Sequence, residues 1–189
     1  MSNYANLKRK ADDYKRVLAN TAAYRQTWDD SLEAEIKREL ETLVAEAELE
    51  ASVSVREEIA NLAAVTLSLG NVRSGMRQEV VSGVERELIK HNGSLVYQQL
   101  FNGKVIVLIQ YPFIENYGKP QPPKTVAIYR PEELRAPFYQ RHLEELLTEV
   151  TKWEDYDDDE PQQKIGFQLN FQQPSLEEPA AAPPIAQAK

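Results

Sequence analysis

The sequence predicts an α+β protein in which a small antiparallel sheet is packed by helices and preceded by a helical pair. Three observations predict this class. Apolar residues recur at spacings of three and four over residues 4–47, which is helical spacing. Asn102-Gly103 separates two apolar runs, which is typical of a β-hairpin. A broad apolar stripe at helical spacing follows Pro137 and suits a helix that covers one face of the sheet.

The first predicted element is a helix over residues 4–28. Its apolar seam alternates spacings of three and four and is interrupted at Thr21 and Arg25; the seam residues are Tyr4, Leu7, Ala11, Tyr14, Leu18 and Trp28. About three and a half heptads are present, so a packed amphipathic helix is favoured over a long coiled coil. Asp30 fits the N-cap of a second helix, and Glu33 completes a capping box. We expect a helical hairpin or a bent rod.

Two shorter helices are predicted between this pair and the hairpin. Ser54 and Glu57 match a capping box, so a helix is expected to begin near residue 55. Residues 64–72 alternate enough for a strand, and both helix and strand stay open there. A further helix is predicted over residues 75–90, with Gly83 as the weak point of its interior and Asn92-Gly93 as its stop.

Residues 94–111 are the most informative stretch, because both predicted strands are apolar on both faces. A two-residue turn at Asn102-Gly103 pairs Leu100 with Val105 and Tyr97 with Leu108. A hairpin exposed on one side alternates apolar with polar residues, so this one is expected to be covered twice, by helices of the chain or by a second molecule. The predicted interface is the face that carries Leu95, Tyr97, Phe101, Ile106 and Leu108.

Three elements are predicted after the hairpin. A third strand covers residues 125–130, and a helix covers residues 137–153, with Pro131 and Pro137 each suited to a first helical turn. Residues 165–171 alternate apolar with polar side chains well enough for a further strand. The predicted division is a helical pair over 1–52, an α+β domain over 53–171 and a disordered tail rich in Pro and Ala over 172–189.

The net charge of −8 is arranged in blocks of alternating sign. Residues 1–28 carry a net +4, residues 29–58 a net −8, residues 59–130 a net +4 and residues 131–189 a net −8. Such blocks favour contacts between blocks, within one chain or between copies, although ordinary solvated faces would give the same pattern. The chain has no cysteine, which excludes disulfides, thiolate metal ligands and a cysteine nucleophile. A basic amino terminus replaces the apolar run of a secretory signal, so we expect a cytoplasmic protein that does not contact membranes.

No catalytic residue and no cofactor is predicted. His91 falls at the end of a predicted helix, where it is expected to cap carbonyl groups. His142 lacks the second histidine of the zinc-protease pattern. The acidic run supplies only weak metal candidates, because calcium-loop spacing puts Glu160 where glycine is needed; they are Asp155, Asp157 and Asp159. A metal-assisted hydrolase that uses this run is the least favoured function, and an enzyme of any kind is less expected than a binding protein.

Basic residues suggest a nucleic-acid or anion surface on the first helix and at the start of the predicted helix over 75–90; they are Lys8, Arg9, Lys10, Lys15, Arg16, Arg73 and Arg77. Tyr4 and Tyr14 could stack on bases but fall on the apolar seam, which favours core positions for both. The function expected first is therefore a non-catalytic interaction or scaffold protein, acting as a homo-oligomer or as a subunit of a larger complex. Nucleic-acid binding through the first helix is the alternative.

Overall fold

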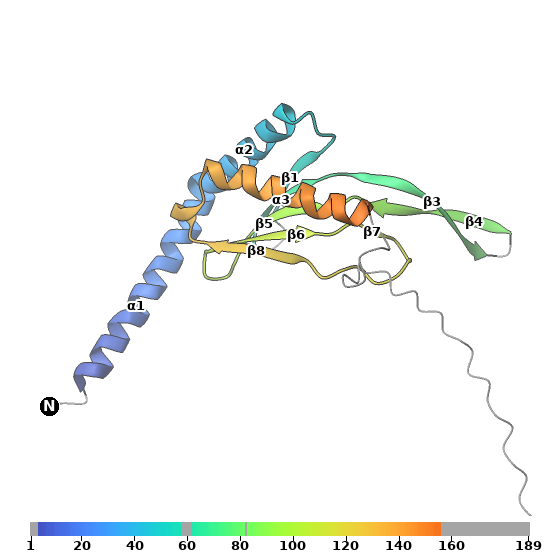
Figure 1. The fold of residues 1–189 in the computed structure, drawn as a ribbon. Helices are drawn as coiled ribbons and strands as arrows, with labels where there is room; N and C mark the ends of the chain where they lie inside the picture. The colour runs from blue at the N-terminus through green and yellow to red at the C-terminus, as the bar shows by residue number, and fades with distance from the viewer. Residues whose placement is uncertain (1–3, 58–61, 82, 156–189) are drawn as a thin grey trace, which may run out of the picture.

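The computed structural model describes residues 4–57, 62–81 and 83–155, and it confirms the predicted α+β fold (Figure 1). The helices are α1 (Tyr4–Thr27), α2 (Glu33–Glu46) and α3 (Ala136–Glu154), with a π-helical turn η1 (Trp28–Leu32) and a 3-10 turn η2 (Pro131–Glu133). The strands are β1 (Ser52–Arg56), β2 (Ala64–Ser68), β3 (Asn71–Val81), β4 (Val84–His91), β5 (Ser94–Gln99), β6 (Val105–Gln110), β7 (Phe113–Ile114) and β8 (Lys124–Tyr129).

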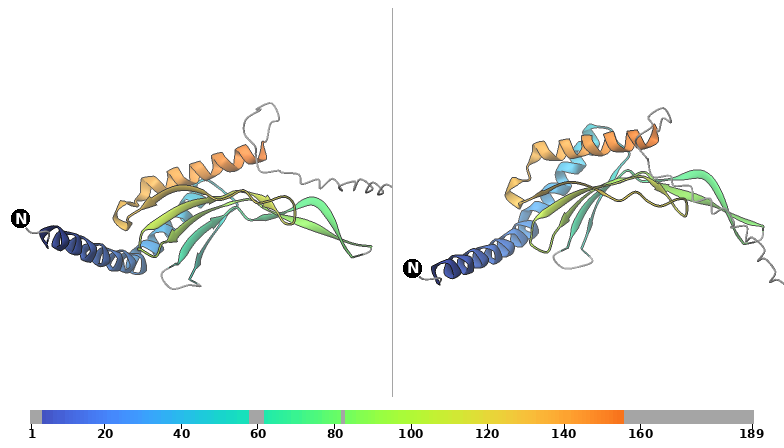
Figure 2. Two further views of the ribbon diagram at one scale, coloured as in Figure 1. Left: turned by 90° about the horizontal axis from the view of Figure 1, so that it is seen from below. Right: turned by 60° about the horizontal axis from the view of Figure 1, so that its bottom comes forward.

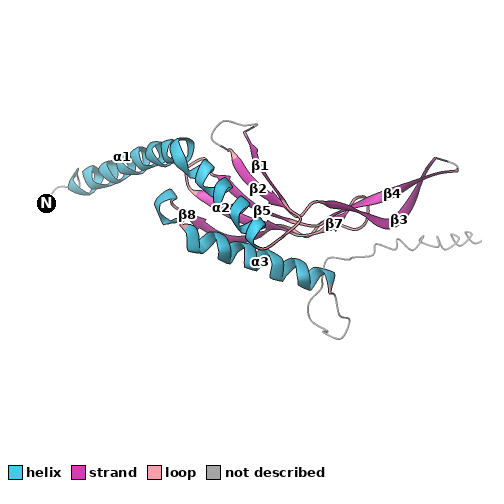
Figure 3. Ribbon diagram, turned by 90° about the horizontal axis from the view of Figure 1, so that it is seen from above, coloured by secondary structure: helices cyan, strands magenta, loops and turns pink. Residues whose placement is uncertain are grey.

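The centre of the molecule is a five-stranded antiparallel sheet in the order β1-β2-β5-β6-β8. Helices α2 and α3 both lie on one face of it, which we call the inner face (Figure 3). The side chains of this face are almost fully buried and form one core with Trp28, Leu32, Ile36 and Leu40 of the helical pair; from the sheet they are Val65, Leu67, Leu95, Tyr97, Val105, Val107 and Ile109. The predicted helical pair therefore shares its core with the sheet.

The predicted two-residue turn of the hairpin is wrong by one residue. Leu100 N–H donates to the Lys104 carbonyl at 2.7 Å and Gly103 N–H donates to the Leu100 carbonyl at 2.8 Å, so the loop has three residues. Gly103 has a φ of 76°, the left-handed conformation that such loops require after their turn. Tyr97 consequently pairs with Val107. A slip of one residue changes which side chains share a face, so the predicted faces were mixed sets.

The helical pair forms a nearly continuous rod. Asp30 lies inside the π-helical turn η1, with no break at which it could act as an N-cap, so that part of the prediction is wrong. Trp28 and Leu32 of this turn are both buried, and Trp28 Nε1 donates to Glu33 Oε2 at 3.2 Å. An extra residue in one helical turn changes the direction in which the following side chains point. It turns the apolar side of α2 towards the sheet without ending the helix.

The two short helices predicted before the hairpin are wrong. Residues 52–56 and 64–68 form the antiparallel pair β1 and β2, which also settles the ambiguous run as a strand. Residues 71–91 form an arm of two long strands, β3 and β4, that projects from the body (Figures 1 and 3). Gly75 and Gly83 have φ values of 74° and 81°, which an α-helix does not accommodate, and valines concentrate around the tip. The β7 strand adds to β4 in this second sheet.

The elements after the hairpin follow the prediction closely. Strand β8 pairs with β6, with an irregularity between Val107 and Leu108. Pro131 begins η2, and Pro137 stands in the first turn of α3, where a missing N–H costs no hydrogen bond. Tyr139, Leu143 and Leu146 of α3 are buried against the sheet. The strand predicted over residues 165–171 and the predicted tail lie outside the described residues.

Candidate functional site

Helix α1 is the feature of the fold that most needs a functional explanation. It is 24 residues long and none of its residues is buried. Leu7 and Tyr14 are each 64% exposed and Leu18 is 51% exposed, so the predicted seam faces solvent in the single chain. The expectation that Tyr4 and Tyr14 belong to the core is wrong, since both are exposed. A helix with so little packing is marginal in water, because helical propensity alone contributes little.

Within the described residues, the end of α1 contacts the body of the molecule at the tip of the hairpin. The Arg25 guanidinium donates to the Phe101 carbonyl. A Cβ placed on Gly103 would lie 2.7 Å from Tyr24 Cβ and 2.9 Å from the Thr21 carbonyl oxygen, so the two backbones approach closely. The polar residues that interrupt the seam, Thr21 and Arg25, are therefore those that meet the hairpin. Residues 4–20 extend beyond this contact (Figure 1).

The predicted basic residues form two separate groups. The first group lies on α1 and is exposed throughout, with Arg16 Nη2 at 2.8 Å from Asp13 Oδ1; its members are Lys8, Arg9, Lys10, Lys15 and Arg16. The second group, Arg73 and Arg77, lies on the arm at the other end of the molecule (Figure 1). The structure does not bring the two groups together, so they do not make one continuous binding surface.

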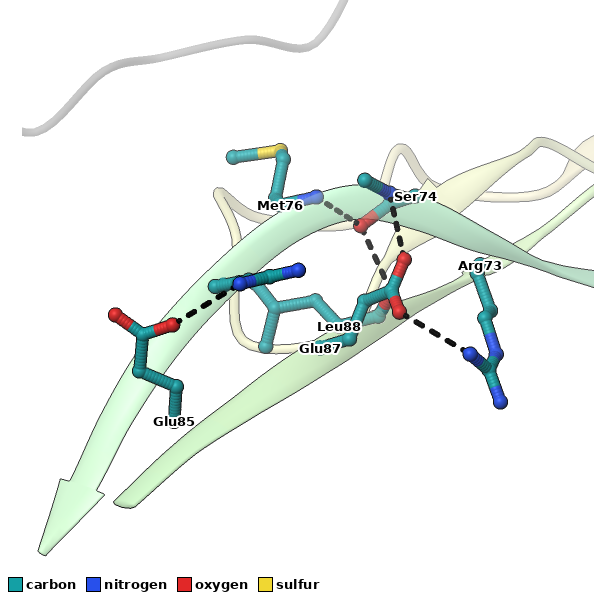
Figure 4. A network of polar contacts seen from close by, with 8 residues as sticks. Arg73, Ser74, Met76, Glu85, Glu87 and Leu88 are labelled. Carbon is teal, nitrogen blue, oxygen red and sulfur yellow. Dashed lines mark hydrogen bonds and ion pairs between the residues drawn. The ribbon is translucent and has the colours of Figure 1, made fainter. Parts of the chain in front are cut away.

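The two arm arginines are matched by carboxylates on the neighbouring strand (Figure 4). Arg73 Nη1 lies 3.6 Å from Glu87 Oε2, and Arg77 Nη1 lies 3.4 Å from Glu85 Oε2. The prediction that they stand at a helix start is wrong, because residues 71–81 are a strand. Ser74 Oγ donates to the Leu88 carbonyl at 2.8 Å, which fixes the strand where its register shifts. These contacts hold the arm together and partly neutralise the charge that an anion would need.

The five predicted interface residues are divided between the core and the surface. Leu95 and Tyr97 are fully buried by the chain itself, so they are core residues. Phe101 is 75% exposed at the hairpin tip. Ile106 and Leu108 point to the face opposite the helices, which we call the outer face, and are partly exposed there. The correct register explains the division, because it puts Leu95 and Tyr97 on one face and Ile106 and Leu108 on the other.

The outer face contains a cavity of about 490 Å³ that the sequence did not reveal. Figure 2 shows the sheet from this side. The register places one row of Ser54, Thr66 and Val96 across β1, β2 and β5, beside a second row of Arg56, Ala64 and Gln98. These six residues line the cavity with Leu62, Ser68, Gly70, Asn71, His91, Gly93, Ser94, Gln110, Tyr111 and Phe113. Hydroxyl, amide and apolar groups are therefore mixed in one concave surface.

Both histidines have structural roles in this chain, and His91 differs from its prediction. His91 lies in β4 and not at a helix end; its ring stacks on Phe113 at 4.3 Å, and its Nε2 lies 3.4 Å from Glu115 Oε1. His142 is 3% exposed and is held between two tyrosines. Its Nδ1 lies 2.9 Å from the Tyr97 hydroxyl and its Nε2 lies 3.0 Å from the Tyr129 hydroxyl. With both ring nitrogens occupied, His142 has no position left for a substrate proton or a metal ion.

Burial lowers the pKa of His142 below its ordinary value of 6.5 and raises the pKa of Tyr97. The neutral ring has one donor and one acceptor nitrogen, so one tyrosine donates to it and the other accepts from it. This arrangement needs an uncharged imidazole and uncharged phenols. The cluster of Tyr97, His142 and Tyr129 is a polar part of the core between the sheet and α3.

We predict that the free energy of unfolding falls as the pH drops below about 6.5. The unfolded chain then takes up a proton at residue 142 that the folded chain resists, which costs at most about 1.4 kcal/mol per pH unit. Urea unfolding between pH 7 and about 5 measures this slope. This pH range lies above the one in which carboxyl groups titrate. His142→Gln can still donate and accept, and it is expected to flatten the slope; an equal slope in both proteins would contradict the assignment.

Metal binding receives no support from the described part of the chain. In residues 4–57, 62–81 and 83–155 there is no group of three or more His, Asp or Glu side chains that could hold an ion. Asp155 is exposed at the end of α3, and Asp157 and Asp159 lie outside the described residues. Within the same ranges no helix is long and apolar enough to cross a membrane.

Comparison with known proteins finds no matching family, no similar curated protein and no similar solved structure. Function must therefore be argued from the surfaces of this chain. Two of them are candidates: the exposed seam of α1 and the cavity of the outer face.

Proposed function

We propose that this protein is a non-catalytic interaction protein that works as a homo-oligomer, with α1 as its contact element. The single observation that carries the proposal is a 24-residue helix with no buried residue and an exposed apolar seam. Exposed apolar rows of this kind mark protein contacts in folded proteins. A partner helix would bury Leu7, Ala11, Tyr14 and Leu18 together, because seam positions meet on one side of a helix.

The charge along the rod supports a second copy of the chain as the partner. Residues 4–27 hold six basic and two acidic side chains, whereas residues 28–46 hold two basic and seven acidic side chains. Two rods side by side in opposite directions would put the basic half of each against the acidic half of the other. The outward side of α2 is exposed and includes Glu41 and Glu46. Such a pair has two-fold symmetry, the commonest arrangement of homo-oligomers.

Pairing α1 with α1 would instead place two positively charged helices together, which costs association energy. We therefore place the α1 seam against the partner's η1 and α2. Complementary charge sets the direction of the pair and speeds encounter, and burial of the seam supplies the affinity. We also expect a cytoplasmic location, which the absence of cysteine supports.

Nucleic-acid binding by α1 is the second candidate, and one observation favours it. The basic side chains of α1 are exposed together with Tyr14, which could stack on a base. The arm arginines do not add to this surface, because Glu87 and Glu85 lie beside them. The overall charge of −8 also opposes association with a polyanion.

A mass measurement in solution distinguishes the two candidates. Light scattering is measured on the unmodified chain over a concentration series that brackets about 10 µM, with the chain alone and with single-stranded DNA or RNA added. Self-association without nucleic acid supports the homo-oligomer. Single chains that gain mass only with nucleic acid, and lose it steeply as salt is added, would instead support the second candidate.

A further inference from the structure

We propose that the cavity of the outer face binds the chain's own carboxyl-terminal segment, within residues 156–171. The inner face of the sheet is covered by α2 and α3, whereas the outer face has a cavity of about 490 Å³ in the part of the chain that is described. The occupant is argued from where the chain leaves the described structure, from charge and from side-chain pattern. It is independent of the contact proposed for α1.

The last turns of α3 lie at the rim of this cavity. A Cβ placed on Gly93 would lie 3.2 Å from Val150 Cγ2, and the Tyr111 hydroxyl donates to Glu149 Oε2 at 3.0 Å. Gly93 and Tyr111 both line the cavity. Lys90, next to the lining residue His91, donates to Glu154 Oε2 at 2.6 Å. The described chain therefore ends, at Asp155, close to the cavity.

The chain length between this point and the apolar part of the segment is sufficient. The ten residues that lead from Asp155 to Ile165 span at most about 33–36 Å when extended. From β5 to β1 the cavity crosses two strand spacings, which is about 10 Å. That reach is more than three times the width of the cavity across β1, β2 and β5.

Charge favours this occupant. The cavity lining has no Asp or Glu, and its one side chain of fixed charge is Arg56, which has no ion pair among the described residues. The segment begins with a cluster of carboxylates, Asp157, Asp158, Asp159 and Glu160. A carboxylate beside Arg56 would gain a charge-assisted hydrogen bond that neither group makes within the described structure.

The side chains of the segment also match the lining. Ile165, Phe167, Leu169 and Phe171 alternate with Gly166, Gln168 and Asn170. The lining offers Leu62, Ala64 and Val96 to the apolar set, which points to one side of an extended segment while the polar set points to the other. The side chains of Thr66 and Gln98 make no hydrogen bond within the described residues, so they can bond the backbone groups of such a segment.

Disulfide trapping tests the proposal cleanly, because the chain has no cysteine of its own. Gln98→Cys is combined with Phe167→Cys in the full chain, and the protein is oxidised mildly. We expect a disulfide within one chain, seen as a faster band in a denaturing gel at the mass of a single chain. The matched control combines Phe167→Cys with Thr148→Cys, an exposed position on α3 that is close in sequence to the segment but on the other face of the sheet.

The cavity pair is expected to cross-link at least about tenfold faster than the control, because binding raises the local concentration of the segment. Adding Arg56→Glu should slow the cavity pair, and Arg56→Lys should not. Equal rates for cavity and control pairs would overturn the proposal. Disulfides only between chains would overturn it as well, since they would assign the cavity to a second copy. Neither result bears on the α1 contact, whose test is the mass of the unmodified chain.

Discussion

Replacing Leu7, Tyr14 and Leu18 together by glutamine is expected to convert the homo-oligomer into single chains. Glutamine keeps the helical propensity of α1 but removes the apolar side chains that a partner would bury. Buried interface side chains of this size contribute on the order of 1–2 kcal/mol each, and a two-fold pair loses six of them, so the triple variant should bind at least about a thousandfold more weakly. Light scattering at the concentration where the unmodified chain associates measures the change.

The matched control removes exposed apolar groups elsewhere. Val72, Val80 and Val84 lie on the arm and are 46%, 59% and 57% exposed. Replacing all three by threonine keeps the β-branched shape and should leave the mass unchanged. Circular dichroism of the glutamine variant should show an unchanged helix content, which means that α1 is retained. If the oligomer survives the glutamine substitutions, or if the threonine control dissociates to the same extent, the seam is not the contact.

Gly103→Ala is expected to lower the free energy of unfolding by about 3 kcal/mol. The left-handed φ of 76° is strained for alanine by about 1–2 kcal/mol, and the added methyl group meets the backbone and Cβ of α1 at less than 3 Å, which costs about 1–3 kcal/mol more. The hairpin tip cannot move away without losing the Arg25 contact to the Phe101 carbonyl. Urea unfolding at pH 7 measures the loss.

Gly118→Ala is the control for this substitution. Gly118 has a φ of 68°, and a Cβ placed there meets nothing within 4 Å. The control isolates backbone strain and should cost about 1 kcal/mol. If both substitutions destabilise the protein equally, the close packing of the hairpin tip on α1 is not formed in solution.

The elements with strong periodicity could be predicted from sequence. Over residues 4–27 and 136–154 the apolar spacing holds for several turns, and prolines mark the start of α3. Asn102-Gly103 predicts the hairpin but not its register. The same dipeptide fits a two-residue turn and a three-residue loop, and only the packing of Leu95 and Tyr97 on the helices selects between them.

The arm could not be recognised because its pattern is ambiguous. Met76, Val80, Val84 and Leu88 are spaced by four, which imitates a helix, while in the structure this stretch is two strands joined near Gly83. The positive φ of Gly75 and Gly83 decides the matter, and a sequence does not display φ. The cross-strand ion pair of Arg77 with Glu85 then helps to hold together the arm, an exposed ribbon of two strands that has little core of its own.

The candidate site could be predicted only in part. Spacing predicts the α1 seam, but an apolar stripe does not say whether the same chain covers it, so spacing alone favours a core position for Tyr14, which is exposed. The cavity of the outer face depends on the register of β1, β2 and β5 and on the chain around Gly93, which bring distant residues together. No local pattern carries that information.

The mass of the unmodified chain in solution tests the central claim most directly. One chain weighs 21.6 kDa. Two-fold pairing of the rods predicts a species of twice that mass at about 10 µM, which splits into single chains on dilution. A mass of one chain at every concentration would contradict the claim that α1 is the contact of a homo-oligomer.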